Sequence, residues 1–407
     1  MPDALYYSKP HQLEFTASVT GVDGQQVALS ATAFYPEGGG QNPDLGKLVW
    51  DGGEAGLVEG AVTDTQKDKA SGEIWHTLSG PVPSVGDEVR GEVDAGVRWR
   101  HEQRHSGEHL LAAAFHKLNP AFAVQAVGMR GPECTLDLAG QPSESDVRAA
   151  EALLRETLGR TPLKLRTSEV SEAELDRYPL RRTTKITGTV RLVIFEEERS
   201  ENVNGVPFDV SACGGLHVPW AAMASPVTVL RTERLKGDLT RVVFMAGEEA
   251  AARLAETYQA SRALAATFSS GPTDLSARVE VLRRQAREAE AQLASLRTAL
   301  IRREIAAAPL EHFGTASLRA LRLDDIAMLP VALSAVPDGE LLVVTTAARR
   351  VGLARGAGLD LHVGELLRSA LSVSGGKGGG KADSAQGQTE DVTAFVGAVR
   401  TVLGNPN

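Results

Sequence analysis

The chain has 407 residues, which is enough for two or three domains of ordinary size. Hydrophobic residues make up 42% and charged residues 23%, a composition typical of globular proteins. The 43 basic and 52 acidic residues give a net charge of −9, which excludes a protein that coats nucleic acid through bulk positive charge. No stretch reaches the roughly 18 apolar residues of a membrane helix, no secretory signal is visible, and two cysteines cannot build a disulfide framework. We therefore expect a cytoplasmic protein with no membrane contact.

Residues 1–92 are expected to form a small β-barrel. Short alternating stretches at 12–19, 47–50 and 72–78 are separated by Gly, Pro and Asp turn signals. Strands this short and this regularly spaced are typical of a barrel. Residues 33–41, Ala-Phe-Tyr-Pro-Glu-Gly-Gly-Gly-Gln, fit either a strand that ends in a glycine turn or a loop whose backbone approaches a ligand.

Residues 93–246 are expected to form an α+β domain. The pattern of apolar residues predicts a helix over 94–118 and a second helix over 143–158, with Ser145 as its N-cap. Strand signals return three times, at 189–195, 227–230 and 241–244.

Residues 247–307 carry a heptad pattern. The apolar residues are spaced alternately by four and three, which predicts a helix with one continuous apolar seam. A Ser-Ser-Gly-Pro break at 269–272 separates this helix from an alanine-rich one before it. We favour an antiparallel helical hairpin over an intermolecular coiled coil, because short breaks commonly join antiparallel neighbours. The seam consists of Leu275, Val279, Leu282, Ala286, Ala289, Leu293, Leu296 and Leu300.

Residues 308–407 are expected to form a small α/β domain, with a strand at 340–346 and helices at 362–371 and 391–403. The glycine-rich segment between the two helices fits the start of a phosphate-binding loop, but Ala382 stands where Ser or Thr must bind Mg²⁺. We therefore exclude ATP binding and interpret the segment as a flexible loop with exposed amides and two lysines.

Two pairs of residues suit a metal ion. His105 and His109 are four residues apart on a predicted helix, so both imidazoles reach one point beside it. Cys213 and His217 have the same spacing, and the two glycines between them allow a tight turn. Together they form a Cys/His₃ set suited to one Zn²⁺ per chain. His101 is interpreted as a residue of the helix surface, and Cys134 as a buried apolar residue.

Four motifs in a fixed order resemble the trans-editing proteins related to alanyl-tRNA synthetase, the AlaX family, over nearly the whole chain. The resemblance is closest to the long subtype, which carries the C-terminal domain of the synthetase. Its implied architecture is an α+β multidomain protein: a barrel, a zinc-containing editing domain, a helical hairpin or coiled coil, and a C-terminal α/β domain. The motifs are Phe-Tyr-Pro-Glu-Gly-Gly-Gly-Gln at 34–41, His-Ser-Gly-Glu-His-Leu-Leu at 105–111, Ser-Ala-Cys-Gly-Gly-Leu-His at 211–217 and the glycine-rich segment at 375–386.

The resemblance implies hydrolysis of mischarged tRNA(Ala), chiefly Ser-tRNA(Ala) and also Gly-tRNA(Ala). It implies that the Cys/His₃ set holds zinc, and that Gln41 acts in catalysis. Ser106 stands where Thr is common in the family, and it keeps the hydroxyl. The competing interpretation is a tRNA-binding protein with structural zinc and no catalysis. Implied substrate-binding residues are Gly38, Gly39, Gly40, Gln41 and Ser106, and we assign tRNA binding to Lys377, Gly378, Gly379, Gly380 and Lys381. The C-terminal half is also assigned to dimerisation.

Overall fold

The computed structural model describes residues 2–184, 186–197 and 207–404 of the chain. The chain divides into two compact units, residues 1–263 and 264–407, and each unit is described by itself. No helix within the described ranges is long and apolar enough to cross a membrane.

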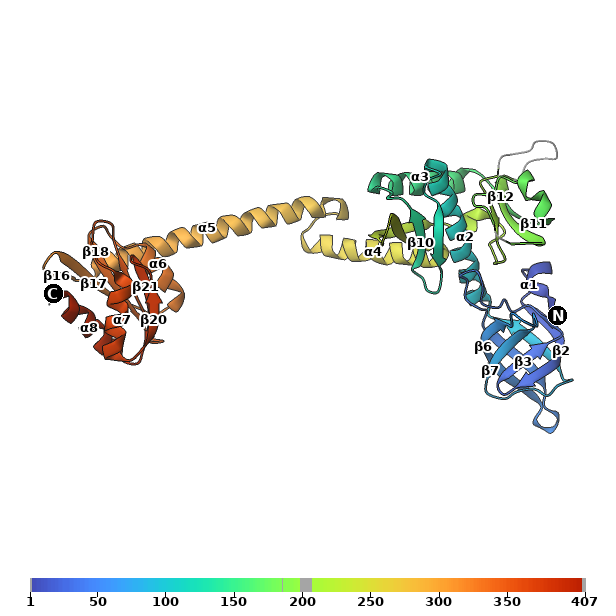
Figure 1. The fold of residues 1–407 in the computed structure, drawn as a ribbon, viewed down its shortest axis with the longest axis horizontal. Helices are drawn as coiled ribbons and strands as arrows, with labels where there is room; N and C mark the ends of the chain where they lie inside the picture. Colours follow the sequence, from blue (N-terminus) through green and yellow to red (C-terminus); the bar gives the residue numbers. More distant parts are fainter. Residues whose placement is uncertain (1, 185, 198–206, 405–407) are drawn as a thin grey trace. The chain divides into compact units, whose positions relative to one another are not determined.

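The first unit begins with a closed six-stranded barrel (Figure 1). Around it the strands follow the order β2, β3, β7, β6, β5, β8. Inward and outward side chains alternate, so that β2 buries Phe15, Ala17 and Val19 between exposed residues. The predicted barrel is therefore confirmed. Its strands are β2 (Glu14–Asp23), β3 (Gln26–Leu29), β5 (Gly46–Asp51), β6 (Leu57–Lys67), β7 (Ile74–Ser79) and β8 (Glu88–Val93), and a 3-10 turn, η1 (Gly53–Ala55), precedes β6.

A short segment ahead of the barrel joins it to the rest of the unit. Strand β1 (Asp3–Ala4) pairs in parallel with β4 (Ala31–Thr32), and one helical turn, α1 (Leu5–Ser8), follows β1. An apolar cluster contains residues from four separate parts of the chain: Tyr6, Tyr35, Ile74 and Leu216. Because Leu216 lies between Cys213 and His217, this cluster brings the glycine loop close to that segment.

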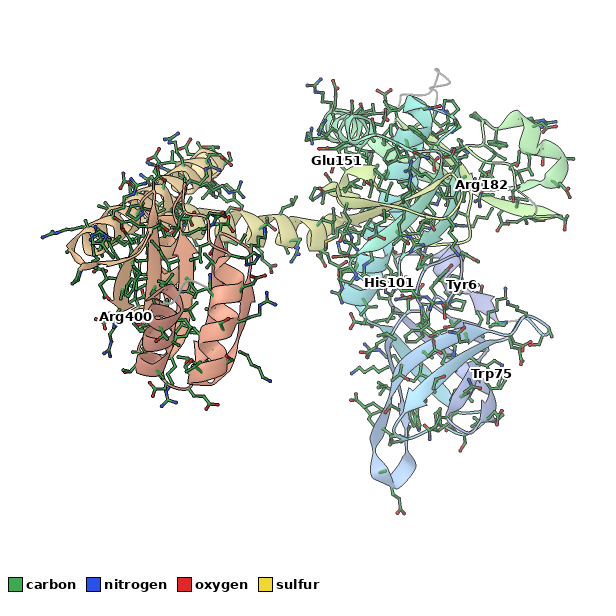
Figure 2. All side chains as sticks on the ribbon, turned by 60° about the vertical axis from the view of Figure 1, so that its left-hand side comes forward. Tyr6, Trp75, His101, Glu151, Arg182 and Arg400 are labelled. Carbon is green, nitrogen blue, oxygen red and sulfur yellow. The ribbon has the colours of Figure 1, made fainter. Side chains whose placement is uncertain are left out.

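Helix α2 (Ala95–Leu118) starts at the barrel, and Asp94 caps it by accepting a hydrogen bond from the Val97 N–H at 2.9 Å. Every residue from 101 to 115 is buried, so this helix has no solvent face over four turns. His101 is only 7% exposed, and its Nδ1 has no hydrogen-bond partner among the described residues (Figure 2). Its placement on the helix surface was therefore wrong, because α2 is covered on all sides.

A buried ion pair fixes α2 to the glycine loop. Arg98 Nε lies 3.1 and 3.0 Å from the two carboxylate oxygens of Asp44, and both side chains are almost fully buried. The same guanidinium donates to the carbonyl oxygens of Pro10 at 2.9 Å and Ala33 at 2.6 Å. Asp44 also accepts from the Tyr35 N–H at 2.6 Å. The Arg98 guanidinium and the Asp44 carboxylate therefore both have hydrogen-bond partners in this buried position.

Two sheets and helix α3 (Glu144–Arg160) surround the rest of α2. Glu151 of α3 accepts a hydrogen bond from the Val229 N–H at 2.8 Å (Figure 2). The N-cap of α3 is Ser143 rather than Ser145, because Ser143 and Asp146 form a reciprocal capping box. One sheet has the order β14, β15, β10, β9 and the other β11, β12, β13. The strands are β9 (Val124–Gly128), β10 (Cys134–Ala139), β11 (Leu163–Ser171), β12 (Thr189–Glu197), β13 (Asp209–Ala212), β14 (Val227–Arg234) and β15 (Leu239–Ala246), with 3-10 turns η2 (Glu172–Arg177) and η3 (Ala221–Ala224).

The predicted break separates two helices, α4 (Gly247–Thr267) and α5 (Leu275–Ala307), with a 3-10 turn, η4 (Pro272–Asp274), between them. Most of the large seam residues of α5 are exposed: Val279, Leu282, Leu293, Leu296 and Leu300 are between 39% and 68% exposed. Near its end, Ile301 and Ile305 are buried in the core of the second unit. The helical hairpin stays a prediction, because α4 and α5 lie mostly in different units.

The second unit contains a six-stranded mixed sheet with the order β16, β17, β18, β19, β21, β20 (Figure 1). The glycine run expected to be a flexible loop is edge strand β20, which pairs antiparallel with β21. That expectation was wrong because glycines, which have no side chain, allow β20 to lie very close to β21. A Cβ on Gly378 would lie 2.6 Å from the Gly387 Cα. The elements are β16 (Leu310–Phe313), β17 (Ala316–Leu323), η5 (Ile326–Met328), α6 (Leu329–Ser334), β18 (Glu340–Thr346), β19 (Arg350–Arg355), α7 (Val363–Ser374), β20 (Gly376–Gly380), β21 (Ser384–Thr389) and α8 (Val392–Gly404).

We predict that Arg98→Met lowers the free energy of unfolding by about 3–5 kcal/mol, because the substitution leaves the Asp44 carboxylate buried without its partner. Urea denaturation measures the change. As a control, Arg90→Met removes an exposed pair with Glu14 and should cost no more than about 1 kcal/mol. Equal destabilisation by the two substitutions would contradict the assigned role of the buried pair.

Candidate metal centre

Four side chains meet at one point in the first unit: His105, His109, Cys213 and His217. Each offers one ligand atom, and these atoms all lie within 4.8 Å of one another. Cys213 Sγ lies 3.3 Å from His105 Nε2 and 3.6 Å from His217 Nε2. A tetrahedral zinc ion with ordinary Zn–S and Zn–N bonds separates such atoms by about 3.5 Å. The spacing of the donor atoms therefore fits zinc.

The local fold explains why the four residues converge. His105 and His109 lie one turn apart on α2, in its fully buried part. Cys213 directly follows β13, and the chain then turns sharply back toward α2. A Cβ on Gly215 would lie 1.9 Å from His105 Cε1, so only glycine allows the turn to approach the imidazole this closely. Arg191 holds the turn by donating to the carbonyl oxygens of Cys213 at 2.8 Å and Gly215 at 3.0 Å.

The outer nitrogen of each histidine also has a partner. His105 Nδ1 lies 2.8 Å from Gln41 Oε1, and His109 Nδ1 lies 3.0 Å from the Asp209 carboxylate. His217 Nδ1 lies 3.2 Å from Ser106 Oγ. Such contacts on the far side of the ring set the tautomer and direct the Nε2 lone pair toward a metal. This arrangement is the usual one for histidines that bind zinc.

The charges of the cluster also suit a cation. Burial raises the pKa of the Cys213 thiol, but His105 and His109 beside it outweigh this effect and hold the pKa well below its usual value. Burial lowers the pKa of His109, but Cys213 and Asp209 outweigh it and raise the pKa to about 10. The lowered pKa of Cys213 favours the thiolate, which is the form of cysteine that binds a metal ion. A thiolate of this kind is expected of a zinc site.

Asp209 supplies a negative charge behind the cluster. Burial raises its pKa, but Arg181 and His109 outweigh that effect and lower the pKa to about 2. Arg181 Nε lies 2.9 Å from the Asp209 carboxylate. Neither Asp209 nor Arg181 was predicted from the sequence as part of the site. The position of Asp209 two residues before Ser211, in a strand that leads directly to Cys213, was a signal that could have drawn attention to it.

The glycine loop reaches the metal centre through Gln41. Besides contacting His105, its Oε1 accepts a hydrogen bond from the Leu216 N–H at 3.0 Å. Its Nε2 is buried and has no hydrogen-bond partner among the described residues. Gly39 and Gly40 have φ values of 60° and 83°, which favour glycine and place Gln41 at the end of the loop. This amide nitrogen is therefore a hydrogen-bond donor for which residues 2–184, 186–197 and 207–404 supply no acceptor.

The structure thus brings together the predicted metal ligands, Gln41 and Ser106. Ser106 is fully buried, and its hydroxyl contacts His217 and accepts from the Val218 N–H at 3.0 Å. Lys377 and Lys381 belong to the second unit and are exposed there. Cys134 is fully buried in the apolar core of the first unit, as predicted.

Two family models match the chain: tRNA synthetases class II (A) over residues 4–97 and the DHHA1 domain over residues 324–405. The chain is 29% identical over 409 residues to the alanine–tRNA ligase of Archaeoglobus fulgidus, and 31% identical over 412 residues to that of Pyrobaculum calidifontis. The chain is related to alanyl-tRNA synthetases. This confirms the resemblance drawn from the four motifs.

These matches cover 96% and 98% of this chain but only 42% and 44% of the two ligases. The chain therefore spans less than half the length of these relatives. A crystal structure of the C-Ala domain from Aquifex aeolicus alanyl-tRNA synthetase matches 24% of this chain with 17% identity. Its TM-score of 0.22 is too low to establish a shared fold.

We predict one zinc ion per chain, measured by elemental analysis of protein purified with zinc in the medium. Cys213→Ala should lose most of this zinc to a competing chelator, because it removes the thiolate that balances the charge of the metal. Cys134→Ala is the matched control, since this cysteine lies in the apolar core. Equal zinc retention by Cys213→Ala and Cys134→Ala would show that Cys213 is not a ligand.

Proposed function

We propose that this protein hydrolyses the ester bond of mischarged tRNA(Ala), chiefly Ser-tRNA(Ala) and also Gly-tRNA(Ala). One observation carries the proposal: a Cys/His₃ metal set lies directly against Gln41, whose buried amide nitrogen has no hydrogen-bond partner in the described part of the chain. The relation to alanine–tRNA ligases supports tRNA(Ala) as the substrate. A zinc ion that only stabilised the fold would not require a buried hydrogen-bond donor without an acceptor, such as Gln41 Nε2, beside it.

A separate editing site has a clear physical reason. A pocket built for alanine cannot strongly exclude glycine, which is smaller, nor serine, which merely adds a hydroxyl. A second site that hydrogen-bonds the serine hydroxyl can discriminate by roughly 10⁴ or more against amino acids that lack it, which makes Ser-tRNA(Ala) the chief substrate and Gly-tRNA(Ala) a lesser one. Hydrolysis at such a site removes the wrong product after it has formed.

In the proposed reaction, Gln41 has two roles. Its Oε1 holds His105 in place, and its Nε2 donates a hydrogen bond to the aminoacyl ester. Gly38, Gly39 and Gly40 form the wall of the substrate pocket, where backbone can approach the substrate closely. Zinc bound at the set would polarise the ester carbonyl or lower the pKa of water. Ser106 acts through His217, because its hydroxyl lies behind that imidazole.

The ligand count favours a second candidate function. Four protein ligands fill the coordination of a tetrahedral zinc ion, and catalytic zinc ordinarily keeps one position open. In this alternative the protein binds tRNA without hydrolysing it, and zinc only stabilises the fold. The two functions differ in one measurable property, which is the rate of ester hydrolysis by the purified protein.

We assign tRNA binding in the second unit to β20 and its flanks, Lys377, Gly378, Gly379, Gly380 and Lys381. Every residue of this strand is exposed, and it lies at the edge of the sheet. Arg350 and Lys377 line a cavity of about 470 Å³ together with Gln386. Two cationic side chains beside exposed glycine backbone suit a phosphate backbone.

We also propose that two copies of the chain pair through the α5 seam, as the alternative to the predicted helical hairpin, which would cover the same seam within one chain. The seam is apolar, heptad-spaced and exposed in the single chain, and a second α5 presents the same pattern. A pairing of this kind places like surfaces against each other, as a two-fold dimer requires.

We predict that the wild-type protein deacylates Ser-tRNA(Ala) faster than Ala-tRNA(Ala), and that Gln41→Ala lowers kcat/KM for Ser-tRNA(Ala) by about 10²-fold. Zinc is kept in excess, because loss of the His105 partner should also weaken zinc binding by about 10- to 100-fold. Gln26→Ala, an exposed substitution on β3, serves as the control. If zinc-loaded wild type hydrolyses none of these esters, the non-catalytic alternative is correct.

The assigned tRNA surface gives a second prediction. Lys377→Ala combined with Lys381→Ala should raise KM for the aminoacylated tRNA with little change in kcat, because each lysine contributes only to binding. The dependence of log affinity on log salt concentration should become less steep by about 2. The control replaces the exposed Lys67 and Lys69 of the barrel. An unchanged salt dependence would remove β20 from the tRNA interface.

A further inference from the structure

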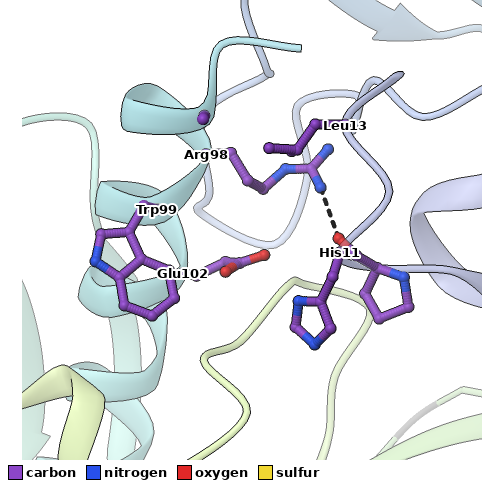
Figure 3. A pocket seen from close by; sticks show the side chains of 7 residues that line it. His11, Leu13, Arg98, Trp99 and Glu102 are labelled. Atoms are coloured by element: carbon purple, nitrogen blue, oxygen red, sulfur yellow. Dashed lines mark hydrogen bonds between the residues drawn. The ribbon is translucent and has the colours of Figure 1, made fainter. Parts of the chain in front are cut away.

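A cavity of about 320 Å³ lies between the start of α2 and the segment that enters the barrel (Figure 3). His11 and Leu13 line it on the barrel side, and Arg98, Trp99 and Glu102 line it on α2. Its volume is at the small end of the range for small-molecule sites, about 300–1,000 Å³. The metal ligands do not line this cavity, and the proposed hydrolysis does not use it.

Glu102 is the unusual residue of this cavity. This residue is only 2% exposed, and no hydrogen bond joins its carboxyl group to the described residues, although its oxygens are not among the fully buried atoms that lack a partner. The nearby Arg98 guanidinium is already held by Asp44, Pro10 and Ala33. Figure 3 shows the Glu102 carboxyl extending into the cavity, toward His11. A buried polar group of this kind costs stability unless a ligand or water satisfies it.

The surroundings of Glu102 also set its protonation. Burial raises its pKa to about 8, with a smaller contribution in the same direction from Asp44 and an opposing one from Arg98. Three charged or titratable groups face it from the elements around the cavity: Arg98 on α2, Asp44 after the glycine loop and His11 before the barrel. At neutral pH the carboxyl group is therefore mostly protonated. It then offers one donor and one acceptor side by side.

Trp99 supplies an aromatic surface in the same cavity. Its indole packs against the core of the first unit and is also part of the cavity wall. The cavity therefore combines a fixed aromatic ring with an adjacent donor and acceptor. Proteins bind unpaired nucleic-acid bases with these two features, stacking the base on an aromatic ring and pairing its polar edge.

We propose that this cavity binds an unpaired nucleobase, with the base stacked on Trp99 and its polar edge paired with Glu102. Adenine fits both features, because its ring nitrogen N1 accepts from the carboxyl O–H and its exocyclic amine donates to the carboxyl C=O. The base comes from the single-stranded end of tRNA, so the inference rests on the proposed function. Glu102 precedes His105 by three residues, about 4.5 Å along the helix axis. The base site and the metal ligand His105 are therefore on neighbouring turns of α2.

The experiment measures binding of a fluorescently labelled RNA tetramer, ACCA, to the full-length protein by anisotropy. Adenosine monophosphate, N6,N6-dimethyladenosine monophosphate and ribose 5-phosphate serve as competitors. The dimethylated nucleotide keeps the stacking surface but has no amine donor, so it should compete roughly tenfold less well than adenosine monophosphate. Ribose 5-phosphate should not compete. Tighter binding of ACCA than of adenosine monophosphate identifies an RNA end as the source of the base, and equal binding identifies a free nucleotide.

Matched variants test the two contacts separately. Glu102→Gln keeps one donor and one acceptor, and should bind within about twofold of wild type, whereas Glu102→Leu should lose roughly tenfold or more. Trp99→Leu should also lose about tenfold, and Trp99→Phe should recover most of the affinity. Between pH 7 and 9 wild-type binding should weaken as Glu102 loses its proton, while binding by Glu102→Gln should stay constant. These readouts need no hydrolysis, so they separate this inference from the proposed function.

Two results would overturn the inference. One is equal competition by ribose 5-phosphate and adenosine monophosphate against the wild-type protein, which does not depend on the folding of any variant. The other is equal loss of binding in Glu102→Gln and Glu102→Leu, which would mean that the donor and acceptor pair does not recognise the ligand.

Discussion

The burial of α2 on all sides from residue 101 to residue 115 is the constraint on which the rest of the first unit depends. A helix with no solvent face must satisfy each polar side chain that it carries, because unpaired buried polar groups are costly. Arg98 pairs with Asp44, and Arg104 pairs with Glu249 at 2.6 Å. Gln103 donates to the Met223 carbonyl and accepts from the Glu248 N–H. These contacts hold the barrel loop and the start of α4 against one helix.

Several of the remaining polar residues of α2 carry the proposed chemistry, whereas His101, whose Nδ1 has no partner among the described residues, has no assigned role. His105 and His109 present their Nε2 atoms to a shared point, and Gln41 and Asp209 satisfy the opposite nitrogens. A cation bound between these ligand atoms would give the His105 and His109 Nε2 atoms a shared partner. Glu102 has no such partner, and it faces a cavity instead. The same rule therefore identifies both the metal centre and the proposed base-binding cavity.

Much of this arrangement could be predicted from the sequence, because it depends on local patterns. Alternation and turn residues indicated the barrel, and two pairs at four-residue spacing indicated the metal ligands. The surroundings of the ligands could not be predicted in this way. Asp209 contacts His109 across 100 residues, and Ser106 contacts His217 across 111 residues. Only the folded chain shows such partners.

The errors have the same origin. His101 lies outside the motif at 105–111, so it was placed on the helix surface, although tertiary packing covers it. The glycines at 376–380 suggested a flexible loop, but a strand neighbour, β21, makes them an edge strand. The helix and the glycine-rich segment were both recognised from the local sequence. Contacts with residues distant in sequence then determined whether His101 is buried and whether the glycine-rich segment forms a strand.

The coordination of the metal is the central claim, and X-ray absorption at the zinc edge tests it most directly. The account predicts a first shell of one sulfur at about 2.3 Å and three nitrogens at about 2.0–2.1 Å. In Cys213→Ala any remaining zinc should show no sulfur in this shell. A wild-type shell of only nitrogen and oxygen, or one with two sulfurs, would contradict the assignment of His105, His109, Cys213 and His217 as the ligand set.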